Sequence, residues 1–427
     1  MNEWGKGMAL LSYPIEERTN WRWWVTPKPL QEKAIHRWFI FPHSFTGKLV
    51  HALIKEWALG SEDNLLDPFA GAGTTVLAAK ECGVPCTGYD LSPLAVLVTR
   101  AKIAKYDITL LKKSYETLKS AIDPSHWNGN LSRPYPDLVQ KALPGKLLSA
   151  FDNIDGEINR LHCQDEEKTF FRLALLSIIP QYSRAIPTGG WLKWIDKGMD
   201  VATLLDVLTE KITTMLKDLE EVNLPAGDLW KMDIADARHL PDHPNTYSAV
   251  ITSPPYPNRH DYTRVFGVEL MFGLLNWKET RQLRYQSFHS HPEAHPDRPS
   301  AEEYCKPRQL TAILDEVSGE SDRRIVRMLD GYFLDMYLCL REVARVCKKG
   351  AKIAFVVGNA QYNNVPVPVD ELTAEIGEQI GLTCEKLIAV RYRGNSAQQM
   401  GKFGRRPSRE SVVVFSHAKV TQAHKKS

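Results

Sequence analysis

The chain has 427 residues, and its 54 Lys and Arg against 51 Asp and Glu give a net charge of +3. Hydrophobic residues make up 43% and charged residues 25%, which is typical of globular proteins and excludes a disordered or fibrous chain. The mild charge does not by itself indicate a nucleic-acid partner. We expect neither a transmembrane helix nor a secretion signal, and the seven scattered cysteines favour reduced thiols in the cytoplasm.

Apolar runs and helical patterns alternate along the chain after an irregular, tryptophan-rich start. Residues 1–35 are predicted to form an arm that packs onto the core. Helices are predicted from Thr74 to just before Gly83 and over 324–347. Strands are predicted at 64–67, 86–89, 247–252, 351–357, 387–390 and 411–415. Strands that alternate with helices predict an α/β fold with a doubly wound, mostly parallel sheet.

Two insertions interrupt this alternation. Residues 103–225 are predicted to be largely helical, with helices at 110–122, 166–179 and 201–219. Residues 277–330 are polar and are predicted to be loop-rich. The remaining pieces are a single core made of 36–102, 226–276 and 331–417, and a basic tail, 418–427. Insertions on a rigid scaffold often carry specificity.

A glycine-rich turn, DPFAGAGTT from Asp67 to Thr75, lies between the first core strand and its helix. Gly71 and Gly73 allow a sharp turn and a close approach of a ligand. The turn lacks the third glycine of the dinucleotide motif and the Gly-Lys-Ser/Thr of a P-loop. It is therefore either a plain structural turn or, at the carboxyl end of a parallel strand, the binding site of a nucleoside-type ligand.

Asp90 ends the next strand, about 20 residues after the glycines, which is where a Rossmann-type fold places a carboxylate against ribose hydroxyls. A solvated aspartate at a strand end is the simpler alternative. The combination with the glycine turn favours ligand contact.

The sequence Thr252-Ser253-Pro254-Pro255-Tyr256 directly follows a predicted strand. The two prolines fix the backbone and remove two N–H donors, so the Ser253 hydroxyl and nearby carbonyl oxygens remain as acceptors. Beside the Tyr256 ring, these acceptors suit an exocyclic amine on a flat base. A plain Pro-Pro turn is the alternative.

Together, the glycine turn and the SPPY motif resemble the S-adenosylmethionine-dependent DNA amino-methyltransferases, which have a Rossmann-like class I methyltransferase sheet. That family methylates the N4 amine of cytosine or the N6 amine of adenine. SPPY resembles the cytosine form, since the adenine form more often begins with Asp or Asn. The resemblance implies a cofactor, S-adenosylmethionine, and a substrate, duplex DNA with a flipped target base. It also implies a cognate restriction endonuclease as partner, and it requires no metal.

The same resemblance assigns the site residues. Ser253, Pro254, Pro255 and Tyr256 are the predicted catalytic residues, whose acceptors would orient the amine for direct in-line attack on the methyl group. Phe41-Pro42-His43-Ser44-Phe45 resembles the motif at the methionine end of the cofactor, and Asp236 resembles the acidic site for its adenine amine. The predicted cofactor-binding residues are Phe41, Asp67, Phe69, Gly71, Gly73, Thr74, Asp90 and Asp236.

Target recognition is assigned to the two insertions, because little chain follows the last predicted strand. A basic segment from Arg391 to Arg409 contains no acidic residue and is predicted to contact phosphates, although a solvated surface is the usual role of such charge. The predicted DNA-binding residues are Arg391, Arg393, Lys402, Arg405, Arg406 and Arg409. Residues 183–194, with Arg, Lys and Trp, either meet DNA or pack their tryptophans inward.

Several alternatives remain open at this point. Adenine-N6 enzymes use the same motifs, RNA guanine-N2 methyltransferases share a similar pair, and a non-catalytic subunit that binds S-adenosylmethionine would keep the fold. A C5-cytosine mechanism through Cys86 is disfavoured, since Cys86 belongs to a predicted buried strand. His289, His291 and His295 match no metal-binding spacing and are interpreted as a polar loop.

Overall fold

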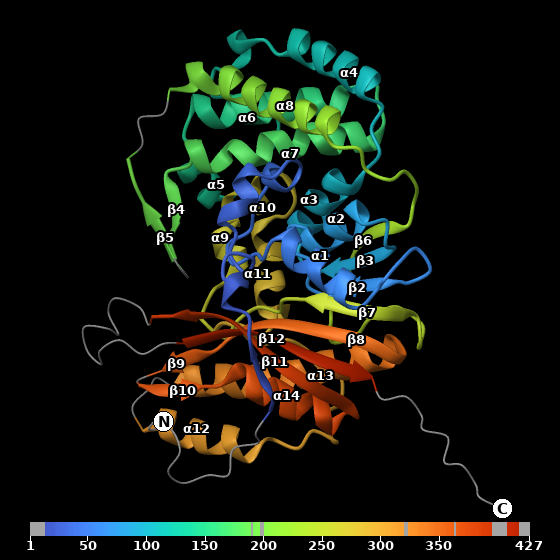
Figure 1. The fold of residues 1–427 in the computed structure, drawn as a ribbon. Helices are drawn as coiled ribbons and strands as arrows, with labels where there is room; N and C mark the ends of the chain where they lie inside the picture. Colours follow the sequence, from blue (N-terminus) through green and yellow to red (C-terminus); the bar gives the residue numbers. More distant parts are fainter. Residues whose placement is uncertain are drawn as a thin grey trace, which may run out of the picture.

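The computed structural model describes residues 13–188, 191–196, 200–319, 323–362, 364–394 and 408–417. Its centre is an eight-stranded sheet of order β1-β11-β12-β8-β7-β2-β3-β6 (Figure 1). The strands are β1 (Ile15–Glu17), β2 (Leu65–Asp67), β3 (Cys86–Asp90), β6 (Trp230–Ile234), β7 (Tyr247–Thr252), β8 (Cys347–Gly358), β11 (Leu382–Arg393) and β12 (Ser408–His417). Only the β11–β12 and β12–β8 pairings are antiparallel, which confirms the mostly parallel α/β sheet.

The two faces of the sheet are covered by different helices (Figure 1). One face carries α1 (Gly47–Glu56), α2 (Thr74–Glu81) and α3 (Pro93–Ile103), and the other carries α13 (Arg323–Val346) and α14 (Val369–Gln379). Successive side chains of a strand point to opposite faces, so Leu65 joins the first core and Leu66 the second. Burial on both faces explains why the central strands are continuous apolar runs.

The order in which the chain adds strands to the sheet reverses between β2 and β7. From β2 it continues to β3 and β6 on one side, whereas β7 and β8 lie on the other side. The carboxyl ends of β2 and β7 are therefore neighbours at a topological switch point, where open α/β sheets bind ligands. The glycine turn follows β2, and the SPPY sequence follows β7.

The arm contributes a strand to this sheet, which its irregular sequence does not predict. β1 pairs in parallel with β11 through the register Ile15 to Leu387. The rest of the described arm packs inward as predicted, since Trp21 is buried and stacks on Trp24 at 4.8 Å between ring centroids. Other residues of the arm are exposed, among them Trp23.

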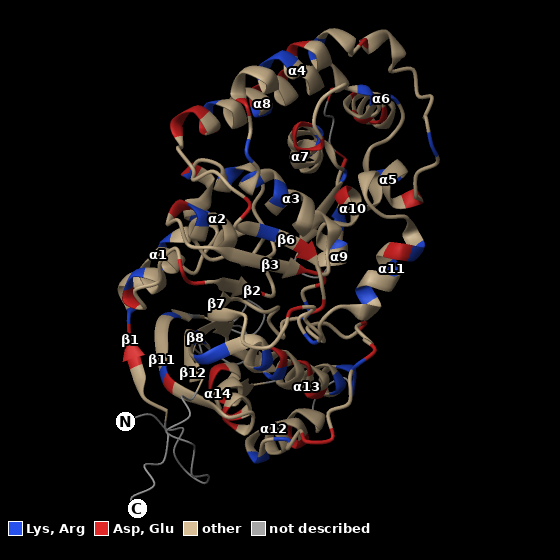
Figure 2. Cartoon of the chain, turned by 90° about the vertical axis from the view of Figure 1, so that its right-hand side faces the viewer, with Lys and Arg blue, Asp and Glu red and all other residues tan. Residues whose placement is uncertain are grey.

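Residues 103–225 form a helical layer on the α3 side of the sheet (Figure 1). Its helices are α4 (Ile108–Ala121), α5 (Asp137–Ala142), α6 (Lys146–Arg160), α7 (Asp165–Tyr182) and α8 (Leu204–Glu221), joined by an antiparallel pair, β4 (Ala185–Thr188) and β5 (Trp191–Trp194). Buried Asp218 of α8 fastens this layer to the arm, because it accepts hydrogen bonds from the Ile35 amide and the Trp38 indole, both at 2.9 Å. Figure 2 shows basic and acidic residues interspersed along α4 and α8.

The prediction that 277–330 is loop-rich is wrong for much of the segment. It contains α11 (Trp277–Gln286) and α12 (Arg308–Ser318), and α13 begins at Arg323. Leu310, Leu314 and Val317 are buried at helical spacing, so a narrow apolar stripe holds α12 in an otherwise polar sequence. Residues 287–307 are irregular. No helix in the described ranges has both the length and the apolar character needed to cross a membrane.

Candidate active site

A pocket opens at the switch point between β2 and β7. The residues that form it come from the segment before α1, the glycine turn, the ends of β3 and β6, and the SPPY turn. It collects nearly all the predicted catalytic and cofactor-binding residues: Phe41, Asp67, Phe69, Gly71, Thr74, Asp90, Asp236, Ser253, Pro254, Pro255 and Tyr256.

Gly73 is the exception among the predicted cofactor residues, since it does not line this pocket. It precedes α2 with a left-handed φ of +78°, and a Cβ there would lie 2.6 Å from the side chain of Thr99 on α3. Its function in the structure is therefore a close packing of the turn against α3. Gly71 has a left-handed φ of +51° and does face the pocket.

Asp90 closes the glycine turn from the neighbouring strand. One carboxylate oxygen accepts a hydrogen bond from the Gly71 amide at 3.0 Å and the other accepts one from the Ser92 amide at 2.8 Å. Burial raises the pKa of Asp90, and the two amide hydrogen bonds oppose this shift. A carboxylate has further acceptor positions, so Asp90 is suited to accept hydrogen bonds from ribose hydroxyls.

Asp67 links the glycine turn to the SPPY turn. It is buried and accepts hydrogen bonds from the Thr252 hydroxyl at 2.6 Å and the Phe69 amide at 3.1 Å. Burial raises its pKa to about 6, and these hydrogen bonds partly oppose that rise. Asp67 thus holds the two strand ends in register while it also lines the pocket.

Asp236 is oriented by a buried arginine. Arg238 donates to both carboxylate oxygens of Asp236, at 2.9 and 2.7 Å, and also contacts Asp335 of α13 at 3.3 Å. The guanidinium is almost fully buried, whereas about a third of the Asp236 side chain is exposed. Sequence reasoning missed Asp335, which is far along the chain in an apolar helix and has no distinguishing motif.

The SPPY turn is held against β8 and β12. The Ser253 hydroxyl donates to the Val356 carbonyl at 3.1 Å, so its lone pairs remain directed to other donors. The Tyr256 hydroxyl lies 3.4 Å from Glu410, and its ring packs on Gly358, where a Cβ would be 3.0 Å from the ring. Tyr256 is therefore supported on one side by backbone.

Lys102 is a second residue that sequence reasoning missed. Its ammonium group is buried on α3 and donates to the carbonyls of Phe39 at 2.7 Å and Ala72 at 2.9 Å. Burial lowers its pKa to about 7. Lys102 thereby joins the segment before α1 to the glycine turn, and nothing in the local sequence distinguishes it from other helical lysines.

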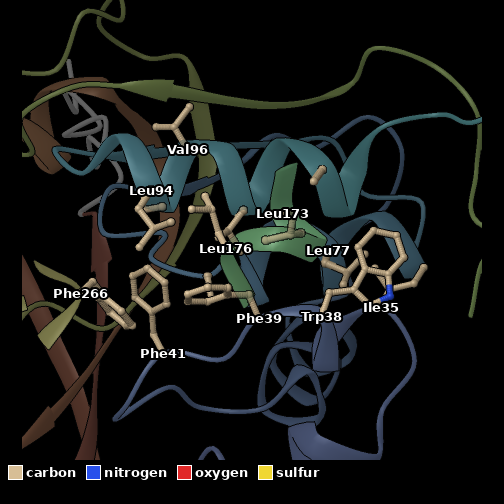
Figure 3. Close-up of a cluster of buried hydrophobic side chains, with 14 of the residues drawn as sticks. Ile35, Trp38, Phe39, Phe41, Leu77, Leu94, Val96, Leu173, Leu176 and Phe266 are labelled. Carbon is tan, nitrogen blue, oxygen red and sulfur yellow. The ribbon is translucent and has the colours of Figure 1, made fainter. Parts of the chain in front are cut away.

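An aromatic wall completes the pocket on the side of Phe41. The Phe41 ring lies 4.4 Å from that of Phe266, with Phe39 and Leu94 beside them (Figure 3). Tyr262 reaches back to the same segment, since its hydroxyl donates to the Pro42 carbonyl at 3.3 Å. Tyr262 begins the short helix α9 (Tyr262–Val265) after the SPPY turn, and Phe266 lies between α9 and α10 (Gly267–Gly273).

Comparisons with known proteins show which family the chain belongs to. The family model described as "DNA methylase" matches residues 12–99, which include the glycine turn and Asp90. Type II methyltransferase M.BsoBI of Geobacillus stearothermophilus is 30% identical to this chain, over 86% of the chain and 82% of the relative. The chain belongs to the S-adenosylmethionine-dependent DNA amino-methyltransferase family. Type II methyltransferase M.AvaI of Nostoc sp. is 27% identical, over 86% of this chain and 83% of the relative.

The methyltransferase uses S-adenosylmethionine as its cofactor, as its family does. A crystal structure of TrmN from Thermus thermophilus is 10% identical, covers 92% of this chain and 53% of that chain, and has a TM-score of 0.32. A likeness at that level carries no conclusion.

Two of the predicted DNA-binding arginines of the methyltransferase have carboxylate partners within the protein. Arg391 pairs with Glu410 at 2.9 Å, and Arg409 pairs with Asp370 at 2.7 Å and Glu371 at 2.9 Å. These carboxylates belong to α14 and to the residue just after the basic segment, so a count of charges within 391–409 overlooks them. Arg393 is the last residue of β11, and Lys402, Arg405 and Arg406 lie outside the described residues.

The burial of side chains tests two other predictions, one on Cys86 and one on the histidines of the segment 287–307. Cys86 is fully buried in β3, and this burial raises the pKa of its thiol, which confirms the interpretation as core. His289 and His291 lie in the irregular segment 287–307, as predicted, but both are buried. Arg298 donates to the ring of His289, and the ring of His291 lies 3.0 Å from the Ser287 hydroxyl. Within the described ranges, no three His, Cys, Asp or Glu residues are arranged to hold a metal ion.

Proposed function

We propose that this methyltransferase transfers the methyl group of S-adenosylmethionine to the N4 amine of cytosine in duplex DNA. The observation that carries the proposal is the position of Ser253 beside Tyr256, at the end of β7 and next to the glycine turn. A serine at this place, in contrast to the Asp or Asn more frequent in adenine enzymes, favours cytosine. Because the Ser253 proton is donated to Val356, its oxygen is oriented as an acceptor for the amine.

The residues of the pocket fit the cofactor. The cofactor supplies an electrophilic methyl group on a sulfonium centre. Gly71 allows close approach of the ligand, Asp90 accepts hydrogen bonds from ribose hydroxyls, and Asp236 accepts one from the adenine amine. Phe69 stands edge-on to Phe288 at 5.5 Å, and these two rings bound the same part of the pocket.

The SPPY turn would activate the amine by position. An exocyclic amine shares its lone pair with the aromatic base and is a weak nucleophile. Ser253 and the Pro254 carbonyl would accept its two hydrogens, which turns the lone pair toward the methyl group. The target base would be flipped out of the duplex and would stack on Tyr256.

The biological setting proposed is a restriction–modification system with a cognate endonuclease. The relatives that the chain matches over most of its length are named Type II methyltransferases. We assign reading of the target sequence to the helical insertion, 103–225, and to the segment 277–330, because neither contributes a strand to the central sheet.

The decisive experiment is methylation of random duplex DNA and, in a parallel reaction, of RNA with labelled cofactor, followed by analysis of the nucleosides. N4-methylcytosine is expected. N6-methyladenine would replace cytosine by adenine in the proposal, labelled RNA alone would indicate an RNA enzyme, and cofactor binding without any product would indicate a binding subunit.

Variants of the turn then test its role. Ser253→Ala should bind the cofactor normally and transfer methyl about 10- to 100-fold more slowly, as expected for the loss of one positioned hydrogen bond. Tyr256→Ala should also weaken capture of the base, whereas Tyr256→Phe should retain much of the activity. Ser61→Ala, in the exposed turn before β2, is the control. Near-normal single-turnover rates in both alanine variants of the turn would make SPPY a structural turn.

A further inference from the structure

Tyr256 has an aromatic neighbour from a distant part of the chain. His43 and Tyr256 both line the pocket, and their ring centroids are 6.4 Å apart with planes inclined by 41°. His43 precedes α1, whereas Tyr256 follows β7. The pair is therefore a product of the fold and is invisible in the sequence.

A base stacked between these two rings would need slightly more room than the structure shows. Carbon atoms in contact are about 3.5 Å apart, so a base between two aromatic planes needs them about 7 Å apart. The ring centroids are 6.4 Å apart and the planes are inclined by 41°. A rotation of the rings toward parallel planes, with a small increase in their separation, would admit one flat base.

His43 is held in this position by two features. Its ring packs edge-on against His260 at 4.9 Å and 87°, and His260 in turn packs on Tyr262 at 5.2 Å. Burial lowers the pKa of His260, so a neutral imidazole supports His43. The backbone of His43 is left-handed, with φ of +65°, a conformation that is uncommon for residues other than glycine.

Such strained residues concentrate at functional sites. Arg259, in the loop after the SPPY turn, is left-handed too, with φ of +66°. Its amide donates to Ser290 at 3.0 Å and its guanidinium lies over the Tyr362 ring. Two strained residues therefore flank the Tyr256 side of the pocket.

We propose that His43 is the second stacking face for the target base, which would be clamped between His43 and Tyr256. This inference rests on the proposed function, because it assumes that a flipped base enters beside Tyr256. It gives His43 a role different from the one that the Phe41–Phe45 motif implies, which is to line the methionine end of the cofactor. The ligand is a flat aminated base, and the slot itself does not distinguish cytosine from adenine.

The test uses the full-length protein and two substitutions of His43. His43→Asn removes the ring but tolerates the left-handed backbone, and His43→Phe keeps an aromatic plane. Single-turnover methylation of random duplex DNA gives the half-saturating DNA concentration, and calorimetry gives the cofactor affinity. His243→Ala is the control, because His243 is exposed at the opposite end of β7.

His43→Asn should raise the half-saturating DNA concentration about 5- to 150-fold, as for the loss of one base-stacking contact, with the cofactor affinity unchanged. His43→Phe should recover most of this loss. The double variant with Tyr256→Ala should lose less than the product of the two single effects, because both rings act on the same base.

Four results would overturn the inference or separate it from the proposed function. An unchanged DNA dependence in His43→Asn, with N4-methylcytosine still formed, would reject the clamp alone. A loss explained by weaker cofactor binding would return His43 to the cofactor site. N6-methyladenine as the wild-type product, with the His43 effects intact, would reject the choice of cytosine and keep the clamp, and a wild type that methylates no DNA would reject both.

Discussion

Asp67 accepts a 2.6 Å hydrogen bond from Thr252, and this bond joins the carboxyl ends of β2 and β7. The two residues lie far apart in the sequence, at the start of the glycine turn and at the start of the SPPY turn. Because Asp67 is fully buried, ionisation of its carboxyl group costs free energy. The hydrogen bond from Thr252 partly offsets this cost. The distance between the proposed cofactor and base sites therefore depends on one buried carboxylate.

The buried carboxylate should make stability depend on pH. The pKa of Asp67 is about 6 in the folded protein against 3.8 for an ordinary aspartate, so the folded state binds the proton more tightly. The stabilisation of the folded protein by this tighter proton binding is fully present below pH 3.8 and is lost as the pH rises through about 6. Relative to Asp67→Asn, the wild type should lose about 3 kcal/mol of unfolding free energy over this interval.

Denaturant unfolding of both proteins from pH 4 to pH 7 measures this difference. Thr252→Val removes the hydrogen bond that lowers the Asp67 pKa, so it should move the transition to higher pH. Parallel curves for wild type and Asp67→Asn would show that Asp67 does not titrate in this range.

Substitutions of the two glycines of the turn should affect different properties, stability for Gly73 and cofactor affinity for Gly71. Gly73→Ala places a Cβ 2.6 Å from Thr99 with an unfavourable φ, so it should reduce stability by about 1–3 kcal/mol. At Gly71 the nearest contact of a Cβ is an ordinary 3.6 Å, to Phe41, but the residue faces the cofactor pocket. Gly71→Ala should weaken cofactor binding by about tenfold or more.

Thermal unfolding and calorimetry with S-adenosylmethionine separate these two outcomes. Thr99→Ala in the Gly73→Ala background should restore part of the stability, since it removes the clashing side chain. Equal losses of stability in both glycine variants, with equal cofactor affinity, would contradict the assignment.

A side chain at Gly358 should lower activity because it would displace the Tyr256 ring. Its φ is ordinary, but a Cβ would lie 3.0 and 3.2 Å from two atoms of the Tyr256 ring, which would have to move by a few tenths of an ångström. Gly358→Ala should therefore slow methyl transfer by about tenfold while cofactor affinity is unchanged, because small displacements at a reacting site are costly. Gly60→Ala is the matched control, since no described atom lies within 4 Å of a Cβ there. Equal single-turnover rates in both variants would refute the prediction.

The basic segment should divide into structural and DNA-binding residues. Neutralising Arg405 and Arg406 together should lower the slope of log affinity against log salt by up to about two. Arg409→Ala should leave this slope unchanged but destabilise the protein by about 3 kcal/mol, since Asp370 is fully buried and loses its ion pair. Salt titrations of DNA binding and unfolding curves measure both effects, and a changed slope in Arg409→Ala would place it at the DNA.

The sequence by itself determined the features that depend on local backbone chemistry. Gly71, Gly73 and the two prolines of SPPY mark turns because they restrict or extend the allowed dihedral angles within a few residues. Apolar runs mark the central strands for a second reason, which is that burial on both faces of the sheet favours apolar side chains. The α/β sheet and most pocket residues follow from such signals, together with the resemblance of the two motifs to one family.

Only the tertiary structure decided which charged and aromatic side chains meet. Arg409 pairs with Asp370, Lys102 reaches Ala72, and His43 faces Tyr256, each across a separation along the chain that no local pattern encodes. Strand β1 likewise forms because the edge of β11 offers unpaired backbone groups. Burial and pairing depend on distances in space, so the partners of these residues, including those of two predicted DNA-binding arginines, become visible only in the folded chain.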